Sequence, residues 1–244
     1  MSTSGFTVSH DGPHVAIVTL TRPDAGNRLT AEDLPGLAQA IRDAGSQPDV
    51  KVVLIKAQGE HFCMGRDPGP VAPSPKSALQ IRNGVTEPIL GIYDAIRGTS
   101  VPVVAVVQGE ARGFGCAFVG QCDLAIASDN ATFSLPEMDT DLPPTLAISA
   151  VLGKIPPKRL THLIYTREKI SAKEALDLGL LSQVVPAAEL ESATQKTVAR
   201  MTDRRRPALE AVKEYMAIAP HLDTNAAARY GSALLSVVLS SKTG

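Results

Sequence analysis

The sequence predicts an α/β fold whose C-terminal third is helical, and two features of the chain indicate it. In the first half, short apolar runs rich in β-branched residues alternate with helical patterns, which is typical of parallel strands joined by right-handed crossovers. After Leu142 the strand patterns nearly vanish and helical patterns follow one another. We therefore expect an α/β core followed by a helical region.

Four apolar runs are predicted to be buried strands because they are continuous and rich in β-branched residues. They are Val15–Leu20, Val52–Ile55, Val101–Val107 and Leu124–Ala127. A helix is predicted between the first two runs, over Leu29–Ala44, because its apolar residues recur at helical spacing, and Thr30 is its candidate cap. A second helix is predicted over about Ser77–Arg97, between the second and third runs.

The C-terminal third carries its own start and stop signals. Ser171–Glu174 is a capping box that opens a short helix, and Gly179 is expected to end it. The run Leu180–Val185 is then predicted to be a last short strand. Three further helices are predicted at Glu189–Met201, Pro207–Ile218 and Asn225–Leu239.

Composition and charge restrict the classes of function. The chain has 244 residues, of which 44% are hydrophobic and 20% charged, ordinary values for a globular protein with a full core. Its formal net charge is −1, so no basic field favours a nucleic-acid or membrane partner. No apolar run approaches the ~18 residues of a membrane helix, and the first residues lack the pattern of a signal peptide.

The cysteines and the other metal-binding residue types suggest neither a disulfide framework nor a cofactor. Cys63, Cys116 and Cys122 are odd in number and lack the spacing of a zinc site. We expect reduced, half-buried thiols in a cytoplasmic protein. No cluster of metal ligands and no dinucleotide-binding fingerprint occurs in the sequence, so we expect no metal and no redox cofactor.

Two glycine-containing turns after predicted strands are the candidate sites of chemistry, because ligands of parallel α/β sheets bind beyond the carboxyl ends of the strands. Glu60–Asp67 follows the second strand, and Gln108–Ala117 follows the third. Glycines allow a close approach of backbones and leave N–H groups free at a helix start, where two such groups can stabilise one oxyanion. On spacing alone, ordinary packing explains these turns as well.

Several segments together form a more specific pattern. In chain order they are Thr21–Asn27, Phe62–Asp67, Val101–Phe118, Cys122–Ser128, Ala131–Glu137 and Ser171–Pro186. These segments resemble the motifs of the crotonase (enoyl-CoA hydratase/isomerase) family, and the resemblance extends from about Val15 to Val212. It implies a crotonase-like (ClpP/crotonase) spiral of ββα units with a helical C-terminal region.

The resemblance also implies a domain organisation and a partner. Residues 1–185 are expected to form the α/β core with the acyl-CoA site, and residues 186–244 a helical trimerisation region. The implied partner is an acyl-CoA substrate of fatty acid metabolism, and the implied assembly is a homotrimer or homohexamer. No cofactor is implied beyond the coenzyme A moiety of the substrate.

By their position in the family motifs, the backbone N–H groups of Arg66 and Phe114 are expected to form the oxyanion hole. The side chain of Arg66 is either a ligand of a coenzyme A phosphate or a solvated loop arginine. The proline-rich stretch Asp67–Pro75 is expected to be an irregular loop where the family usually has a helix. The substrate- and CoA-binding residues that the resemblance implies are Cys63, Met64, Gly65, Arg66, Asp67, Gly113 and Phe114.

Hydratases of this family use two glutamates, and this chain has one of them. Glu137 stands in the Pro-Glu motif, whereas Ala117 occupies the other position. A 1,3 proton shift needs one base, whereas hydration generally needs two carboxylates. Ala117 in place of the second glutamate therefore favours isomerisation, with Glu137 as the single acid/base. Asp141 is either an auxiliary acid or a loop or helix-cap aspartate. Three aromatic residues either wall the acyl pocket or pack in the core: Tyr93, Phe114 and Phe118.

The sequence leaves other functions open on the same scaffold. Hydration with another acid, hydrolysis of a thioester or of a carbon–carbon bond, and decarboxylation are the alternative reactions. A catalytically silent acyl-CoA binder is a further alternative, because a fold alone does not determine the reaction.

Overall fold

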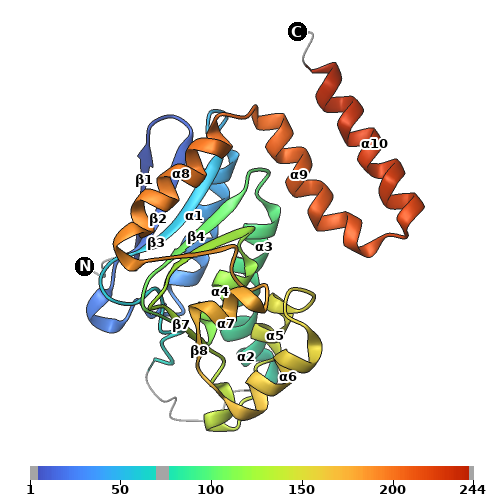
Figure 1. Cartoon of the computed structure of the whole chain (residues 1–244). Helices are drawn as coiled ribbons and strands as arrows, with labels where there is room; N and C mark the ends of the chain where they lie inside the picture. Colours follow the sequence, from blue (N-terminus) through green and yellow to red (C-terminus); the bar gives the residue numbers. More distant parts are fainter. Residues whose placement is uncertain (1–4, 70–76, 242–244) are drawn as a thin grey trace.

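A six-stranded sheet forms the centre of the structure (Figure 1). The computed structural model describes residues 5–69 and 77–241. All neighbouring strands pair in parallel except β1, which is antiparallel to β2 at the edge of the sheet. In spatial order the strands are β1 (Phe6–Asp11), β2 (Val15–Leu20), β3 (Val52–Ala57), β4 (Val103–Val107), β6 (Leu124–Ser128) and β9 (Gln183–Val185).

A second sheet of three short strands continues the chain from β4. Its strand β5 (Glu110–Arg112) pairs in parallel with β7 (Thr132–Ser134), and β8 (Ile170–Ser171) is antiparallel to β7. Because only Gln108 and Gly109 separate β4 from β5, the small sheet begins where β4 leaves the large one. The carboxyl end of β4 therefore lies next to the small sheet.

Helices cover both faces of the large sheet and form the C-terminal region. They are α1 (Asp33–Ser46), α2 (Ala78–Ile81), α3 (Glu87–Gly98), α4 (Phe114–Gln121), α5 (Thr145–Val151), α6 (Pro157–Thr166), α7 (Ala172–Asp177), α8 (Leu190–Thr202), α9 (Arg206–Ile218) and α10 (Thr224–Ser240). A π-helical turn, Arg82–Thr86, joins α2 to α3. Within the described part of the chain, no helix is both long and apolar enough to span a bilayer.

The two faces of the large sheet bury different side chains, because successive residues of a strand point to opposite faces. On one face, Ile55 of β3 belongs to the same buried cluster as Leu37 of α1, and α1 packs against α3. On the other face, Leu54 of β3 belongs to a smaller cluster with Val198 of α8. The sheet is thus covered by α1 and α3 on one side and by α8 on the other.

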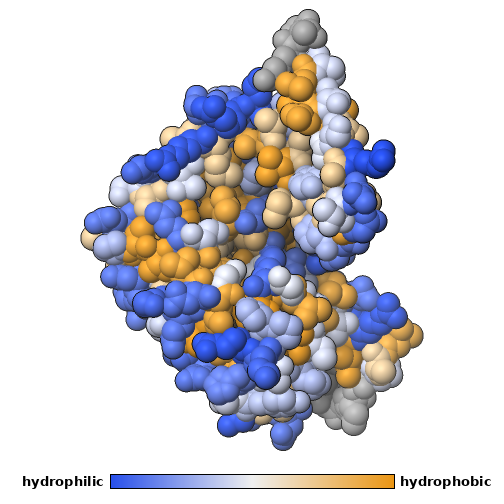
Figure 2. Space-filling model, turned by 45° about the vertical axis from the view of Figure 1, so that its right-hand side comes forward, coloured by the Kyte–Doolittle hydropathy of each residue, from blue (hydrophilic) through white to orange (hydrophobic). Residues whose placement is uncertain are grey.

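The last two helices stand away from the sheet (Figure 1). Lys213 anchors α9 to the core, because its buried ammonium group binds the Asp123 carboxylate, the Thr99 hydroxyl and two backbone carbonyls. Helix α10 packs against α9, and none of its seventeen residues, all of them described, is buried. Figure 2 shows hydrophobic surface over the end of α10, where Leu235 and Leu239 are exposed. The separate role expected for residues 186–244 stays a prediction.

The four predicted strands are confirmed as β2, β3, β4 and β6, with ends shifted by up to two residues. The sequence patterns do not predict β1, β5, β7 or β8. Three of these have only two or three residues, and β1 is mostly exposed, so none of them shows a continuous apolar run. These short strands nevertheless decide where the site loops lie.

The predicted start of the first helix is wrong. The helix expected from Leu29 begins at Asp33, because Leu29 pairs with the loop after β3. Its N–H group donates to the carbonyl of Gly65 at 3.1 Å, and its carbonyl accepts from the N–H group of Asp67 at 2.8 Å. Thr30 still accepts a hydrogen bond from the N–H group of Asp33 at 3.3 Å.

The signals in the C-terminal third predict the structure well. The capping box at Ser171 and Glu174 is confirmed, and Gly179 follows α7 with a φ of +84°. The three C-terminal helices are confirmed as α8, α9 and α10, whereas the last strand covers only the end of the predicted run. Helices α5 and α6 have no predicted counterpart. The proline-rich loop expected over Asp67–Pro75 lies outside the described residues from position 70 onward.

Candidate active site

The loop after β3 pairs with the first strand of the small sheet. Cys63 donates its N–H group to the carbonyl of Glu110 at 3.2 Å, and its own carbonyl accepts from the N–H group of Arg112 at 2.9 Å. These bonds form a parallel bridge between Cys63 and Ala111. The two glycine-containing turns singled out in the sequence therefore lie side by side.

Glycines allow the backbones of the two turns to approach so closely. A Cβ atom at Gly115 would lie 2.0 Å from the carbonyl oxygen of Cys63, which no side chain tolerates. Gly65 has a φ of +100°, and a Cβ atom there would lie 3.1 Å from the carbonyl oxygen of Arg112 and 3.9 Å from the nitrogen of Phe114. Both positions therefore require glycine.

Two backbone N–H groups remain free where the turns meet. Gly65 and Asp67 use their backbone groups in the pairing with Leu29, and the N–H group of Arg66 lies between them without an acceptor among the described residues. Phe114 is the first residue of α4, so its N–H group has no partner inside the helix either. Two such groups, one of them at a helix N-terminus, can stabilise a negative oxygen.

Glu137 lies beside these amides. It begins the 3-10 turn Glu137–Thr140 after β7, and its Oε1 atom lies 3.0 Å from the point where a Cβ atom on Gly113 would be. Its Oε2 atom is buried and accepts no hydrogen bond from the residues that the structure describes. Burial raises the pKa of Glu137, while its own backbone N–H group and the charge of Arg112 lower it. The carboxylate is therefore poised to accept a proton.

Arg112 is a site residue that sequence reasoning missed. It is half-buried on β5, and the residue opposite it on β7 is Ser134, three positions before Glu137. This pairing brings a positive charge within electrostatic range of the Glu137 carboxylate. Three-residue strands have no sequence signal strong enough to predict such a pairing.

The buried ring of Phe114 contacts two other buried aromatic rings. The ring of Tyr93 stacks on Phe114 with 6.2 Å between centroids and 9° between planes, and Phe114 contacts Phe118 at 5.7 Å. Cys116 on α4 is buried like the other two cysteines, not half-buried as expected, and all three are free thiols. Burial and the charge of Glu137 raise the pKa of Cys116 to about 12, so its thiol stays protonated.

Comparison with known proteins identifies the family. The model of the enoyl-CoA hydratase/isomerase family matches residues 11–242. The chain belongs to this family. "Enoyl-CoA hydratase domain-containing protein 3, mitochondrial" of Homo sapiens is 33% identical over 78% of this chain and 62% of its own length. The chain thus spans less than two thirds of that relative.

Two bacterial relatives of the family carry different activities in their names. The "(E)-benzylidenesuccinyl-CoA hydratase" of Thauera aromatica is 32% identical, with 82% of this chain and 78% of that protein covered. The "(7aS)-7a-methyl-1,5-dioxo-2,3,5,6,7,7a-hexahydro-1H-indene-carboxyl-CoA hydrolase" of Rhodococcus jostii is 30% identical, with 86% and 80% covered. Membership of the family therefore leaves the reaction open.

Solved structures of the family confirm the crotonase-like fold expected from the sequence. An enoyl-CoA hydratase of Mycobacterium smegmatis superposes with a TM-score of 0.91 at 25% identity, over 97% of this chain and 91% of that chain. A putative enoyl-CoA hydratase of Thermobifida fusca, solved in complex with CoA, superposes with a TM-score of 0.85 at 28% identity, over 98% and 95%.

The structure places the expected binding residues in and around the paired turns. The Cys63 side chain is fully buried and donates to the carbonyl of Asn27 at 3.3 Å, so it faces the protein interior. The Arg66 guanidinium donates to the carbonyl of Asp67 at 3.1 Å, and the Asp67 carboxylate accepts from the N–H group of Gly69 at 2.8 Å. Direct contact of these side chains with a substrate stays a prediction.

Asp141 and Met64 lie at the margins of the site. Asp141 is exposed at the end of the 3-10 turn that begins at Glu137, with a left-handed φ of +56°. Its role as an auxiliary acid stays a prediction. Met64 is half-buried and packs beside Gly26, where a Cβ atom would lie 2.5 Å from the methionine Cγ atom.

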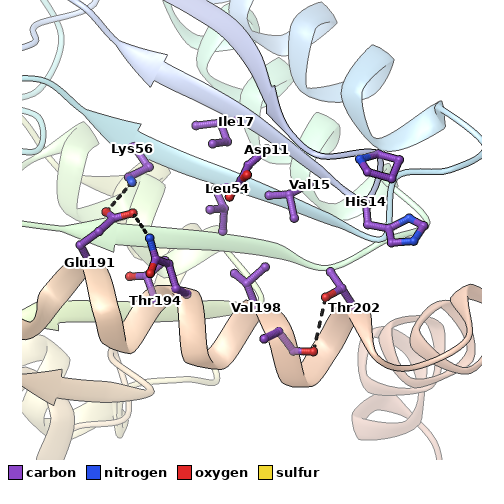
Figure 3. A pocket seen from close by; sticks show the side chains of 13 residues that line it. Asp11, His14, Val15, Ile17, Leu54, Lys56, Glu191, Thr194, Val198 and Thr202 are labelled. Atoms are coloured by element: carbon purple, nitrogen blue, oxygen red, sulfur yellow. Dashed lines mark hydrogen bonds and ion pairs between the residues drawn. The ribbon is translucent and has the colours of Figure 1, made fainter.

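A hollow on the opposite side of the molecule offers no comparable chemistry. It has a volume of about 280 Å³ and lies between α8 and the strands β2 and β3 (Figure 3). Its base is apolar, with Leu54 and Val198, and its charged residues Lys56 and Glu191 pair with each other at 2.6 Å. Within the described ranges, no group of three or more His, Cys, Asp or Glu residues could hold a metal ion.

Proposed function

We propose that this protein moves the double bond of an enoyl-CoA thioester by transfer of one proton. Glu137 is the single acid/base, and the N–H groups of Arg66 and Phe114 hold the thioester oxygen. One observation supports this most strongly: within residues 5–69 and 77–241, the buried Oε2 atom of Glu137 has no hydrogen-bond partner, and it lies beside two amides without acceptors. Ala117 is fully buried on α4 and provides no second carboxylate.

The reaction needs only groups that the site contains. Glu137 removes a proton from C2 of a 3-enoyl thioester, and the negative charge moves onto the thioester oxygen. The two N–H groups stabilise this dienolate, a type of interaction for which losing one donor raises the barrier by about 3 kcal/mol. Glu137 then returns the proton to C4, which leaves the double bond between C2 and C3. Neither a metal nor a redox cofactor takes part in these steps.

Replacement of the base tests the proposal. In Glu137→Gln, isomerisation of 3-hexenoyl-CoA should fall by about 10²–10⁴-fold, because an amide of the same shape cannot accept the proton. The matched control is Glu191→Gln, on the opposite side of the sheet, which should retain the wild-type rate. Wild-type isomerisation by Glu137→Gln would show that the base is a different residue.

Addition of water is the second candidate function. It is supported by the hydratase and the hydrolase among the relatives, at 32% and 30% identity. Both reactions use an oxyanion at the thioester carbonyl and a base that activates water, so Glu137 and the two amides would keep their roles. Conversion of 2-hexenoyl-CoA to the 3-hydroxy product, or steady release of free coenzyme A, would favour this candidate.

Binding of the coenzyme A moiety is part of the same proposal. The relative from Thermobifida fusca was solved with CoA, which supports an acyl-CoA ligand here. The guanidinium of Arg66 is a candidate ligand of a CoA phosphate, since it is only half-buried at the edge of the loop. We keep the cytoplasm as the proposed location, because the three cysteines are free thiols.

The proposed assembly is a homotrimer or homohexamer formed through the C-terminal helices. Helices α9 and α10 expose large hydrophobic side chains to solvent in the single chain, among them Val212, Met216, Leu235 and Leu239. Apolar surface of this extent on an extended helix pair is typical of a protein–protein contact.

A further inference from the structure

Asn27 is a buried polar residue beside the loop that carries the Arg66 amide, and the proposed mechanism does not use it. It is 1% exposed, and its backbone has a left-handed φ of +54°. Asparagine adopts this conformation more readily than most residues with a side chain. A buried amide needs partners for its oxygen and for both of its hydrogens. The partners of Asn27 therefore show which segments it holds together.

The side chain of Asn27 joins two separate segments of the chain. Its Nδ2 group donates to the carbonyls of Gln58 and His61, each at 2.8 Å. Its Oδ1 atom accepts from the N–H group of Arg22 at 3.0 Å. Both hydrogens of the amide and its oxygen are thus paired. These bonds attach the turn after β2 to the chain that leaves β3.

The backbone around Asn27 holds the start of the amide loop (Cys63–Asp67). The carbonyl of Gly26 accepts from the N–H group of Met64 at 2.8 Å. The carbonyl of Asn27 itself accepts from the thiol of Cys63 at 3.3 Å. The turn that Asn27 stabilises is therefore also the surface on which the amide loop begins.

Leu29 holds the part of the amide loop that carries the free N–H group. It pairs with Gly65 and Asp67, the two neighbours of Arg66, at 3.1 and 2.8 Å. The N–H group of Arg66 lies between two fixed residues, so its direction follows the placement of Leu29. Asn27 sets this placement, because its φ of +54° turns the chain two residues before Leu29.

We propose that Asn27 is a positioning residue for the Arg66 amide: its buried side chain fixes the turn against which the amide loop pairs. The inference rests on the proposed function, in which this amide holds the thioester oxygen. Asn27 acts through the loop and does not touch the substrate. Displacement of the amide should weaken its bond to a negative oxygen more than its bond to a neutral one, because charge-assisted hydrogen bonds are about twice as strong.

The variant Asn27→Gly keeps the left-handed backbone accessible and removes the three side-chain hydrogen bonds. The readout is the affinity for the enolate of 3-oxohexanoyl-CoA, followed by its ultraviolet absorbance, divided by the affinity for hexanoyl-CoA. The enolate presents a negative oxygen to the amides, and hexanoyl-CoA presents a neutral carbonyl. The ratio should fall about tenfold, the value of one hydrogen bond to a charged group. The kcat of isomerisation should fall by roughly 10²-fold, as for a displacement of about 1 Å.

The second variant, Asn27→Asp, has nearly the same shape and also tolerates the left-handed backbone. It keeps an acceptor for the N–H group of Arg22 but, as a carboxylate, cannot donate to Gln58 and His61. The same fall in the ratio is expected. Circular dichroism shows which variants are folded, so the inference can be tested with either one.

The matched control is Thr99→Val, which removes a buried hydroxyl with three hydrogen-bond partners. Thr99 precedes β4, whereas the site lies beyond the other end of this strand. The control should lose stability as the Asn27 variants do, but keep the wild-type ratio and kcat. A wild-type ratio in a folded Asn27 variant would overturn the inference. An equal fall in both affinities would also overturn it, because it would indicate a general loss of structure.

Failure of the proposed function gives a different result. Isomerisation by Glu137→Gln would count against the base alone, since the affinity ratio depends on the amides and needs no turnover. A wild-type protein without preference for the enolate would overturn both the oxyanion site and the role of Asn27. Preference for the enolate that persists in the Asn27 variants would overturn this inference only.

Discussion

Glu137 experiences two opposing influences, and under the proposed mechanism their balance determines the pH dependence of the activity. Burial raises the pKa of its carboxyl group, and the charge of Arg112 lowers it. The base must be ionised to accept a proton, so activity is present above this pKa and is lost as the pH falls through it. We expect the acid limb of kcat/KM for 3-hexenoyl-CoA to lie above the ~4.3 of a free glutamate.

Removal of the Arg112 charge should shift this limb further. In Arg112→Met the pKa of Glu137 should rise, so the acid limb moves to higher pH, whereas activity well above the limb changes less. The measurement is kcat/KM against pH for both proteins, with the exposed Arg200→Met on α8 as control. An acid limb at the same pH in Arg112→Met would contradict the coupling.

At the scale of single residues, motifs predict what a backbone position must do, but not which charges surround it. The positions of Gly65, Gly113 and Glu137 next to one another could be predicted because they depend on local geometry and on their place in a motif, and their roles stay predictions. Arg112 could not, because its charge acts on Glu137 only after β5 has paired with β7. The missing partner of the Glu137 Oε2 atom within the described part of the chain is likewise a property of the packed structure.

At the scale of elements, the contact between the turn before α4 and the loop after β3 sets the distance between the two amides. In Gly115→Ala the new Cβ atom would overlap the carbonyl oxygen of Cys63 and push the two backbones apart. A displacement of about 1 Å in such a site lowers the rate by roughly 10²-fold, and we expect a loss of that size in kcat.

A second glycine provides the control for this variant. A Cβ atom at Gly91 on α3 meets nothing within 4 Å, so Gly91→Ala should retain activity and fold normally. Circular dichroism of both variants separates a local displacement from unfolding. Wild-type kcat in Gly115→Ala would show that the amides tolerate the shift.

Lys213 is one of two cations that attach α9 to the core, the other being Arg206 at the start of the helix. Lys213→Met removes the ammonium group from the Asp123 carboxylate and from two backbone carbonyls, and hydrogen bonds of a charged group typically contribute about 1.5–3 kcal/mol. The free energy of unfolding from urea titration should fall by about this amount. Lys173→Met, which removes a fully exposed lysine paired with Asp177, should change it little. Equal stability of the two variants would contradict a role of Lys213 as anchor.

Elements with long apolar periodicity could be predicted from the sequence, and elements defined by their neighbours could not. The C-terminal helices have such periodicity, and the buried strands β2, β3, β4 and β6 have continuous apolar runs. Strand β1 is mostly exposed and forms only as an edge against β2. The late start of α1 has the same origin, because Leu29 pairs with the loop at Gly65 instead of continuing the helix.

At the scale of the whole molecule, the α9–α10 pair exposes several large hydrophobic side chains. Leu235 and Leu239 are 59% and 50% exposed and lie one turn apart on α10, so they form a contiguous apolar patch of the kind that marks a contact with another protein surface. If these helices form the proposed subunit contacts, a charge on their apolar face should separate the subunits. We expect the double variant Leu235→Glu/Leu239→Glu to have the mass of one 25.6 kDa chain by light scattering, and the unmodified protein three or six times that mass.

The control Val8→Glu also replaces an exposed apolar residue, on the edge strand β1, and should keep the wild-type mass. A wild-type mass in the double variant would place the subunit contact elsewhere, and a monomeric unmodified protein would show that these helices serve another partner.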